Sequence, residues 1–136
     1  MAHEPTLDEV IATAEFRSAL RQFLRASERV ARKAGLTPQR YLLLLLIKGA
    51  PDRSQQATVT DLSRRLQLAQ STVTELVRRA VDVGLLEREP SATDARVGHV
   101  RLTREGERRL ALAFTELARE RSELRALVSR LERGNR

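Results

Sequence analysis

Positions that are apolar except for Ser27 recur at alternating spacings of four and three from residue 16 to residue 34. They lie within residues 7–34, a stretch without glycine or proline. This period is typical of an α-helix with a heptad seam. The seam consists of Phe16, Leu20, Phe23, Ser27, Val30 and Ala34. We predict one long helix, which Gly35 ends. An ordinary core-facing helix is the alternative, but so long a helix in so short a chain favours contact with a second chain as well.

A second helix is predicted between Thr37, a suitable N-cap, and Gly49. Pro38 suits the first helical position. The run from Tyr41 to Ile47 is apolar on every side, so this helix should be central and buried. We interpret Tyr41 as a core residue and not as a ligand contact.

Two shorter helical patterns follow, over residues 60–66 and 70–83. Thr60 is the predicted N-cap of the first, and Thr58–Val59 could add a short strand before it. Apolar side chains recur at helical spacing in the second, at Val73, Leu76, Val77, Ala80 and Val81. Helix, turn and helix in this order can place the second helix in a DNA major groove.

Two strand-like runs, residues 85–89 and 97–102, flank a polar, turn-forming segment and predict a hairpin. Such a wing can lay an arginine into the DNA minor groove. Arg96 is the candidate for this contact. Asp94 could pair with it, or with a nearby arginine, and fix the shape of the wing.

Thr103 is predicted to cap a last helix that runs to about Arg133. Its seam positions again alternate at four and three: Leu110, Phe114, Leu117, Arg121, Leu124, Val128 and Leu131. Seams at both ends of the chain predict a helical layer shared by two chains, hence a homodimer. The predicted subunit contacts are Phe16, Leu20, Leu117, Leu124, Val128 and Leu131. Arg121 marks the edge of the seam or pairs with an acid across the dimer.

The predicted fold is mainly α with a small β-wing, in one domain over residues 1–136. Residues 8–34 and 104–132 are the dimerisation helices, and residues 37–103 form a winged helix-turn-helix lobe. The net charge of +7 draws the protein to polyanions. Among the 25 basic residues only Lys33 and Lys48 are lysine. This preference for arginine could also reflect a GC-rich genome.

The sequence has no cysteine, which excludes disulfides and thiol redox sensing. Neither a signal peptide nor a membrane span is expected, and a cytoplasmic location fits best. His3 and His99 are far apart, so we expect no metal site. No serine has an evident base and no glycine-rich phosphate loop is present. The sequence therefore predicts neither an enzyme nor a cofactor.

The outer face of the helix at 70–83 carries short hydrogen-bonding side chains followed by charged ones. Serine and threonine can contact phosphates or base edges, glutamine can pair with adenine, and glutamate can accept from the cytosine amino group. The alternative to DNA contact is an ordinary solvent-exposed face, because any solvated amphipathic helix has polar residues on its outer side. The candidate DNA contacts are Gln70, Ser71, Thr72, Thr74, Glu75, Arg78 and Arg79.

An ordered set of short motifs resembles the MarR-type winged-helix regulators over about residues 8–132. The motifs are Leu36-Thr37-Pro38-x-x-Tyr41, Val59-Thr60-Asp61-Leu62-x-x-x-Leu66, Ser71-Thr72-Val73-Thr74-x-Leu76-Val77-x-Arg79, Gly84-Leu85-Leu86-x-Arg88, and Asp94-x-Arg96 followed by Val100-x-Leu102-Thr103-x-x-Gly106.

The resemblance implies a homodimer, joined by its terminal helices, on palindromic operator DNA. Residues 70–83 would be the recognition helix and Arg96 the minor-groove contact. Many members are repressors released by small phenolic or lipophilic ligands, which bind between the dimer layer and the DNA-binding lobe. Glu75 stands where an arginine is frequent in the family, so the operator sequence cannot be inferred from a relative.

Two alternatives remain open: a winged-helix module that binds protein, and a DNA-binding regulator without a ligand. Residues 58–80 hold four arginines against Asp61 and Glu75. This balance favours DNA over protein as the partner.

Overall fold

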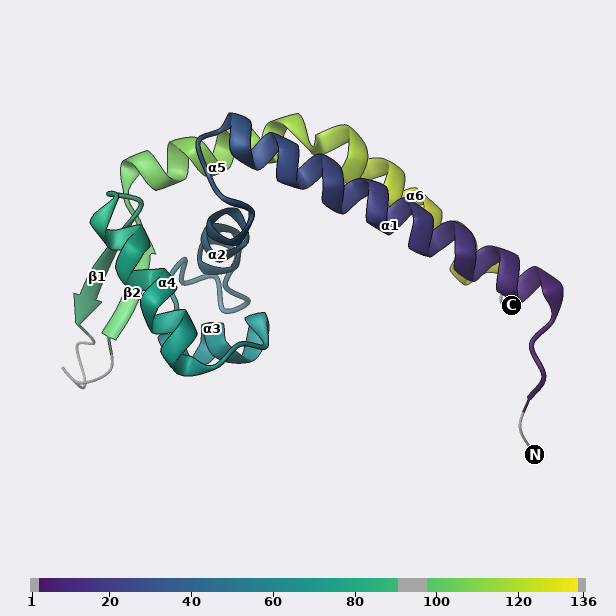
Figure 1. Ribbon diagram of the computed structural model, residues 1–136, viewed down its shortest axis with the longest axis horizontal. Helices are drawn as coiled ribbons and strands as arrows, with labels where there is room; N and C mark the ends of the chain where they lie inside the picture. Colours follow the sequence, from purple (N-terminus) through teal and green to yellow (C-terminus); the bar gives the residue numbers. More distant parts are fainter. Residues whose placement is uncertain (1–2, 91–97, 135–136) are drawn as a thin grey trace.

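The computed structural model describes residues 3–90 and 98–134. Within them the chain forms six helices and one two-stranded sheet: α1 (Leu7–Lys33), α2 (Pro38–Lys48), α3 (Val59–Leu66), α4 (Gln70–Asp82), β1 (Leu86–Pro90), β2 (Gly98–Leu102), α5 (Arg104–Glu116) and α6 (Ala118–Gly134). Figure 1 shows a lobe of α2, α3, α4 and the sheet, from which α1 and α6 extend as an arm. The predicted fold class, mainly α with a β-wing, is confirmed.

The arm is two helices thick and has almost no core of its own. Only Ala26 and Ala31 are buried in α1, and no described side chain of α6 is buried. α6 returns along α1, so the start of α1 and the end of α6 lie at the same tip (Figure 1). Within residues 3–90 and 98–134, no helix has the length and hydrophobicity that a membrane-spanning segment requires.

α2 is the central helix of the lobe, and Thr37 caps it as predicted. The Thr37 hydroxyl accepts a hydrogen bond from the N–H of Arg40 at 3.1 Å. The side chains that α2 buries are those of Tyr41, Leu43, Leu44 and Ile47. Leu42 is exposed, so the prediction of burial on every side is wrong there. The core covers only part of the circumference of α2, and an apolar run cannot indicate which part stays uncovered.

α3 begins earlier than predicted, because Thr58 and not Thr60 is its N-cap. The Thr58 hydroxyl accepts from the N–H of Asp61 at 3.1 Å, and the Asp61 carboxylate accepts from the N–H of Thr58 at 3.4 Å. This reciprocal pair needs an acidic or amide side chain three residues after the cap. Asp61 is at that distance from Thr58, whereas Ser63 is at that distance from Thr60.

β1 and β2 form the predicted antiparallel hairpin, with Leu86 opposite Leu102. A single bridge also joins Ala57 to Val100. The extra strand predicted at Thr58–Val59 is therefore wrong. The chain pairs with the wing one residue earlier and then enters α3 at once.

The last helix is interrupted, not continuous as predicted. α5 and α6 meet at Leu117, whose side chain is fully buried. Arg121 donates a hydrogen bond to the carbonyl of Phe114, and its guanidinium lies 3.6 Å from the centroid of the Phe114 ring. A side chain thus satisfies a carbonyl near the end of α5, where the chain changes direction. Arg121 has a role within one chain that its place in the seam did not indicate.

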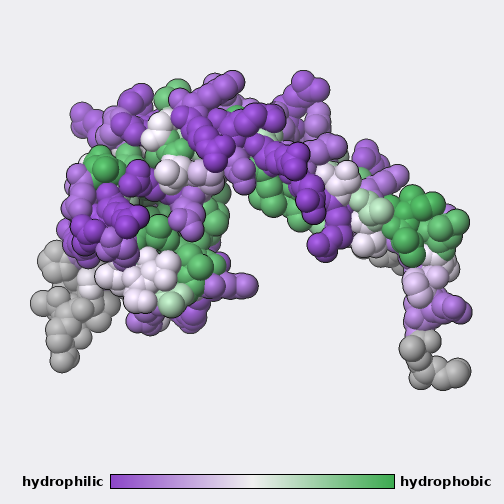
Figure 2. Space-filling view, viewed as in Figure 1, coloured by the Kyte–Doolittle hydropathy of each residue, from purple (hydrophilic) through white to green (hydrophobic). Residues whose placement is uncertain are grey.

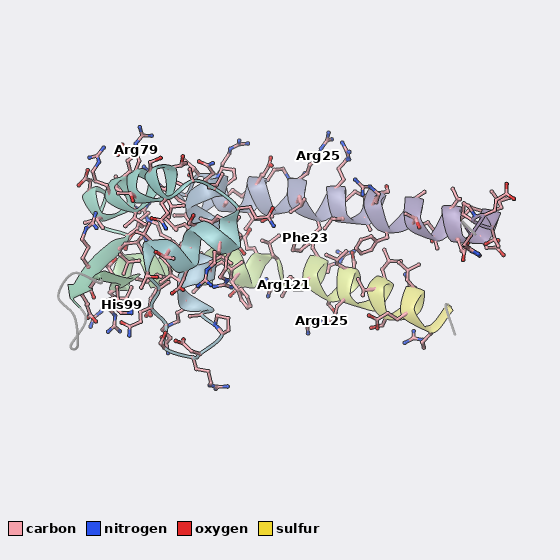
Figure 3. All side chains as sticks on the ribbon, turned by 90° about the horizontal axis from the view of Figure 1, so that it is seen from below. Phe23, Arg25, Arg79, His99, Arg121 and Arg125 are labelled. Atoms are coloured by element: carbon pink, nitrogen blue, oxygen red, sulfur yellow. The ribbon has the colours of Figure 1, made fainter. Side chains whose placement is uncertain are left out.

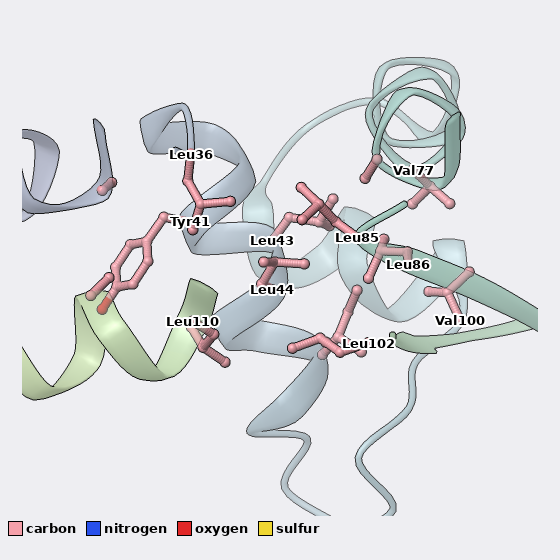
Figure 4. Packing of buried hydrophobic residues seen from close by; sticks show 14 of the residues in the cluster. Leu36, Tyr41, Leu43, Leu44, Val77, Leu85, Leu86, Val100, Leu102 and Leu110 are labelled. Carbon is pink, nitrogen blue, oxygen red and sulfur yellow. The ribbon is translucent and has the colours of Figure 1, made fainter. Parts of the chain in front are cut away.

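The core lies between α2, α4, the hairpin and α5 (Figure 4). Thr103 caps α5 as predicted: its hydroxyl accepts from the N–H of Gly106 at 3.1 Å and donates to the carbonyl of Gly84 at 2.6 Å. Gly106 is buried against the backbone of Leu85. These contacts fix the start of α5 to the turn between α4 and β1, and so hold the wing beside α4.

Candidate nucleic-acid interface

The outer face of α4 is polar and exposed. Val73, Val77 and Ala80 are fully buried on its other side, as the predicted apolar stripe requires. Glu75 is partly exposed. The exposed candidates on this face are Gln70, Ser71, Thr72, Thr74, Arg78 and Arg79.

α4 begins without a side-chain cap. Its N-cap is Ala69, which has no side-chain oxygen to accept from the first backbone N–H groups. α1, α2, α3 and α5 each have a threonine that does so. Within the described residues, no side chain caps the N–H groups at the start of α4, and the helix dipole there favours a negative acceptor.

The second half of the outer face is a network of ion pairs. Glu75 accepts two hydrogen bonds from Arg78, at 2.6 and 2.9 Å, and one from Arg79 at 3.0 Å. Arg78 also pairs with Asp82 at 2.9 Å. Asp82 is not among the residues predicted from the sequence, although its spacing of four residues from Arg78 is a recognisable signal for such a pair.

Glu75 stays ionised over the whole physiological pH range. The hydrogen bonds from Arg78 and then from Arg79 lower the pKa of its carboxyl from 4.5 to about 2. Two carboxylates, Glu75 and Asp82, therefore face two guanidiniums, and the charges of this half of α4 sum to zero. The two arginines remain exposed but are already paired.

The other two arginines counted between residues 58 and 80 are also engaged. Arg64 pairs with Asp61 at 2.9 Å. Arg65 donates from Nη1 to the carbonyl of Leu46 at 2.8 Å, which joins α3 to α2. The balance of four arginines against two acids thus overstates the positive charge that this surface offers to a partner.

The predicted wing contacts Asp94 and Arg96 lie outside the described residues. On the described part of the wing, Arg101 lies 3.8 Å from Glu87 and 3.3 Å from Glu89. Both acids are on the opposite strand. Arg101 thus links the two strands of the hairpin through its side chain, and periodicity alone did not indicate this contact.

A cavity of about 280 Å³ lies between the start of α2 and α4. Arg40 and Arg79 contribute charge to its lining, and Pro38 and Leu76 contribute apolar surface. Tyr41, one residue further along α2, is buried at 7% exposure and belongs to the core, as interpreted from the sequence. Burial raises the pKa of its phenol, while the charge of Arg121 acts in the opposite direction.

The predicted subunit contacts have two different environments. The side chains of Phe16, Leu20, Leu124, Val128 and Leu131 are partly buried along α1 and α6. Leu117 is fully buried inside the single chain, so it supports the junction of α5 and α6 from within and offers no surface to a second chain. Figure 3 shows Phe23 between α1 and α6, whereas Arg25 points away from α6.

The sequence model that describes the MarR family matches residues 34–97 of this chain. A Thauera aromatica protein assigned to transcriptional regulation of the hcr operon is 30% identical over 117 residues. That alignment covers 86% of this chain and 66% of the relative, so the chain spans just under two thirds of the length of the relative.

Solved structures share the fold. A MarR family protein from Bacillus stearothermophilus has a TM-score of 0.72 at 23% identity, over 88% of this chain and 82% of that one. A point mutant of S. aureus MepR bound to an oligodeoxyribonucleotide has a TM-score of 0.66 at 18% identity, over 91% and 97% of the two chains. The winged-helix architecture is therefore common to this chain and these proteins.

Proposed function

This chain belongs to the MarR family, and on that premise we propose that it is a dimeric, sequence-specific DNA-binding regulator of transcription in the cytoplasm. In this proposal it acts on palindromic duplex DNA as a repressor, and a small ligand relieves the repression. The observation that carries the proposal is the first half of α4, where exposed neutral donors and acceptors surround an uncapped helix start. MepR has the same fold and binds an oligodeoxyribonucleotide, so the fold is compatible with this function.

Recognition would use neutral hydrogen-bonding groups at the N-terminal end of α4, which lies at the bottom of the lobe in Figure 1. Ser71, Thr72 and Thr74 can approach base edges closely because their side chains are short. The backbone N–H groups behind them suit a phosphate. Arg96 would add a wing contact in the minor groove, as proposed from the sequence.

The arm would set the distance between two such lobes. α1 has 27 residues, which corresponds to a length of about 40 Å. Two recognition helices on one face of a duplex are roughly 34–36 Å apart, or about 10 base pairs. A dimer joined along helices of this length can therefore place two copies of α4 in successive major grooves.

Replacing Thr72 by Ala is expected to lower affinity for the operator about tenfold, because one base contact is worth roughly 1–3 kcal/mol. The unfolding temperature should not change, since Thr72 is exposed. The measurement is a gel shift with the DNA upstream of its own gene. Thr115→Ala, an exposed position on α5, is the matched control. An equal loss on all DNA sequences would mean that Thr72 contacts only the backbone.

The cavity beside Arg40 and Arg79 is the proposed effector site. Its mixed lining suits a small aromatic anion, such as a phenolate or carboxylate. The same Arg79 pairs with Glu75 on the DNA face. An anion in the cavity would draw Arg79 away from that face and so change how α4 meets DNA.

Benzoate is expected to raise the unfolding temperature of the protein and to weaken its binding to operator DNA, since a ligand stabilises the state it binds. Benzyl alcohol, which lacks the charge, is the control probe. Arg40→Ala should remove the effect of benzoate while leaving DNA binding in place. Equal effects of both probes would contradict recognition of an anion.

A protein-binding winged-helix module is the second candidate, favoured by the paired charges on α4. Such a module would not distinguish one duplex sequence from another. The gel shift with upstream DNA therefore separates it from a regulator. A shifted band that a scrambled duplex competes away equally well favours the module.

A further inference from the structure

Glu75 is placed to hold both exposed arginines of α4 at once. A residue three positions along a helix and one four positions along lie on the same side of it. Arg78 occupies the first position and Arg79 the second, and both bond the Glu75 carboxylate. Together with the pair between Arg78 and Asp82, these bonds leave no net charge on the half of α4 that follows the proposed base contacts.

DNA phosphates and Glu75 compete for the same donors. A guanidinium binds a carboxylate and a phosphate through the same paired N–H groups. Binding to a phosphate displaces counterions from the duplex, which is the main source of affinity for DNA of any sequence. An arginine that is already paired contributes less of this affinity, because its existing bonds must first be broken.

We propose that Glu75 is an internal competitor for the DNA backbone, which weakens binding to DNA of any sequence and thereby leaves discrimination to the neutral groups at the start of α4. This inference rests on the proposed DNA-binding function. It gives Glu75 a role other than the cytosine contact expected from its position. It also makes Glu75 a determinant of the ratio between specific and non-specific binding.

The two arginines differ in what remains when Glu75 is neutralised. Arg78 keeps its pair with Asp82 at 2.9 Å. Arg79 has Glu75 as its acidic partner among the described residues. When the Glu75 carboxylate is removed, the gain in DNA affinity should therefore come mainly from Arg79.

The experiment compares wild-type protein with Glu75→Gln on a mixed-sequence duplex by fluorescence anisotropy at several salt concentrations. The variant should bind more tightly, and the slope of log affinity against log salt should become steeper by about 1 per chain, the value for one added phosphate contact. Adding Arg79→Ala to Glu75→Gln should return the slope to the wild-type value.

α5 supplies a matched control in the same geometry. Glu105 accepts from Arg108 at 2.6 and 2.9 Å and from Arg109 at 2.8 Å. These bonds, first from Arg108 and then from Arg109, lower the pKa of its carboxyl to about 2 as well. Glu105→Gln removes one negative charge from a similar network on α5, which is not the proposed recognition helix, so it should leave the slope unchanged.

The possible outcomes separate this inference from the function on which it rests. A steeper slope for Glu75→Gln alone supports the competitor role. If Glu75→Gln binds the mixed-sequence duplex no more tightly than the wild type does, the competitor role is overturned. If Glu105→Gln gains as much affinity as Glu75→Gln, the competitor role is also overturned, because the gain then reflects net charge alone. If neither the wild type nor Glu75→Gln binds duplex DNA, the proposed function fails and the competitor role fails with it.

Discussion

Gly106→Ala is expected to destabilise the protein by about 3 kcal/mol, the upper part of the usual range for overpacking. A Cβ at this position would lie 2.2 Å from the carbonyl oxygen of Leu85 and 3.2 Å from its carbonyl carbon. Both atoms belong to the backbone and cannot rotate away. The same carbonyl accepts from the N–H of Thr103 at 3.0 Å, so a shift of either segment would also strain the cap of α5.

Thermal unfolding measures this effect, which should lower the midpoint by roughly 10 °C for a domain of this size. Gly98→Ala is the matched control. It lies on the wing, and a Cβ there would meet nothing within 4 Å. If both variants unfold at the same temperature as the wild type, the close approach of α5 to Leu85 is not what holds the wing beside α4.

Val10→Glu is expected to dissociate the proposed dimer and to lower operator affinity by about 10²–10⁴, the usual gain from linking two binding modules. The tip of the arm exposes Leu7, Val10 and Ile11 (Figure 2). A two-helix arm cannot cover these side chains itself. A second chain would bury them, and a carboxylate in such a contact lacks a partner.

Val83→Glu is the control for Val10→Glu, because both valines are 51% exposed in the single chain. Both variants add one negative charge, but Val83 lies at the end of α4 on the lobe. Sedimentation should show a monomer for Val10→Glu and a dimer for Val83→Glu. If Val10→Glu remains a dimer with normal DNA affinity, the tip of the arm is not part of the interface.

Much of the fold could be predicted because its signals are local. Thr37 and Thr103 cap helices by bonding backbone groups within one turn, and the stripe on α4 follows the helical period. The break at Leu117 was missed for the opposite reason. The apolar spacing continues through it, and the interruption depends on Arg121 reaching back to Phe114, a contact that periodicity does not encode.

The polar outer face of α4 could be predicted from the sequence, but the pairing of its charges could not. The side chains expected to face DNA do lie on the exposed face of α4. Their charges were counted one by one, whereas the structure pairs Arg78 and Arg79 with Glu75. Similarly, Leu117 fits the seam as well as Leu124 does, yet only the tertiary fold determines which of them is buried inside one chain.

The most direct test of dimeric, sequence-specific DNA binding is the mass and affinity of the complex with an upstream duplex. Sedimentation of the complex should give two chains per duplex. At about 150 mM salt, affinity for the upstream duplex should exceed that for a scrambled one by at least about 10³, the lower end of the usual specificity ratio. One chain per duplex, or equal affinity for both DNAs, would contradict the proposed function.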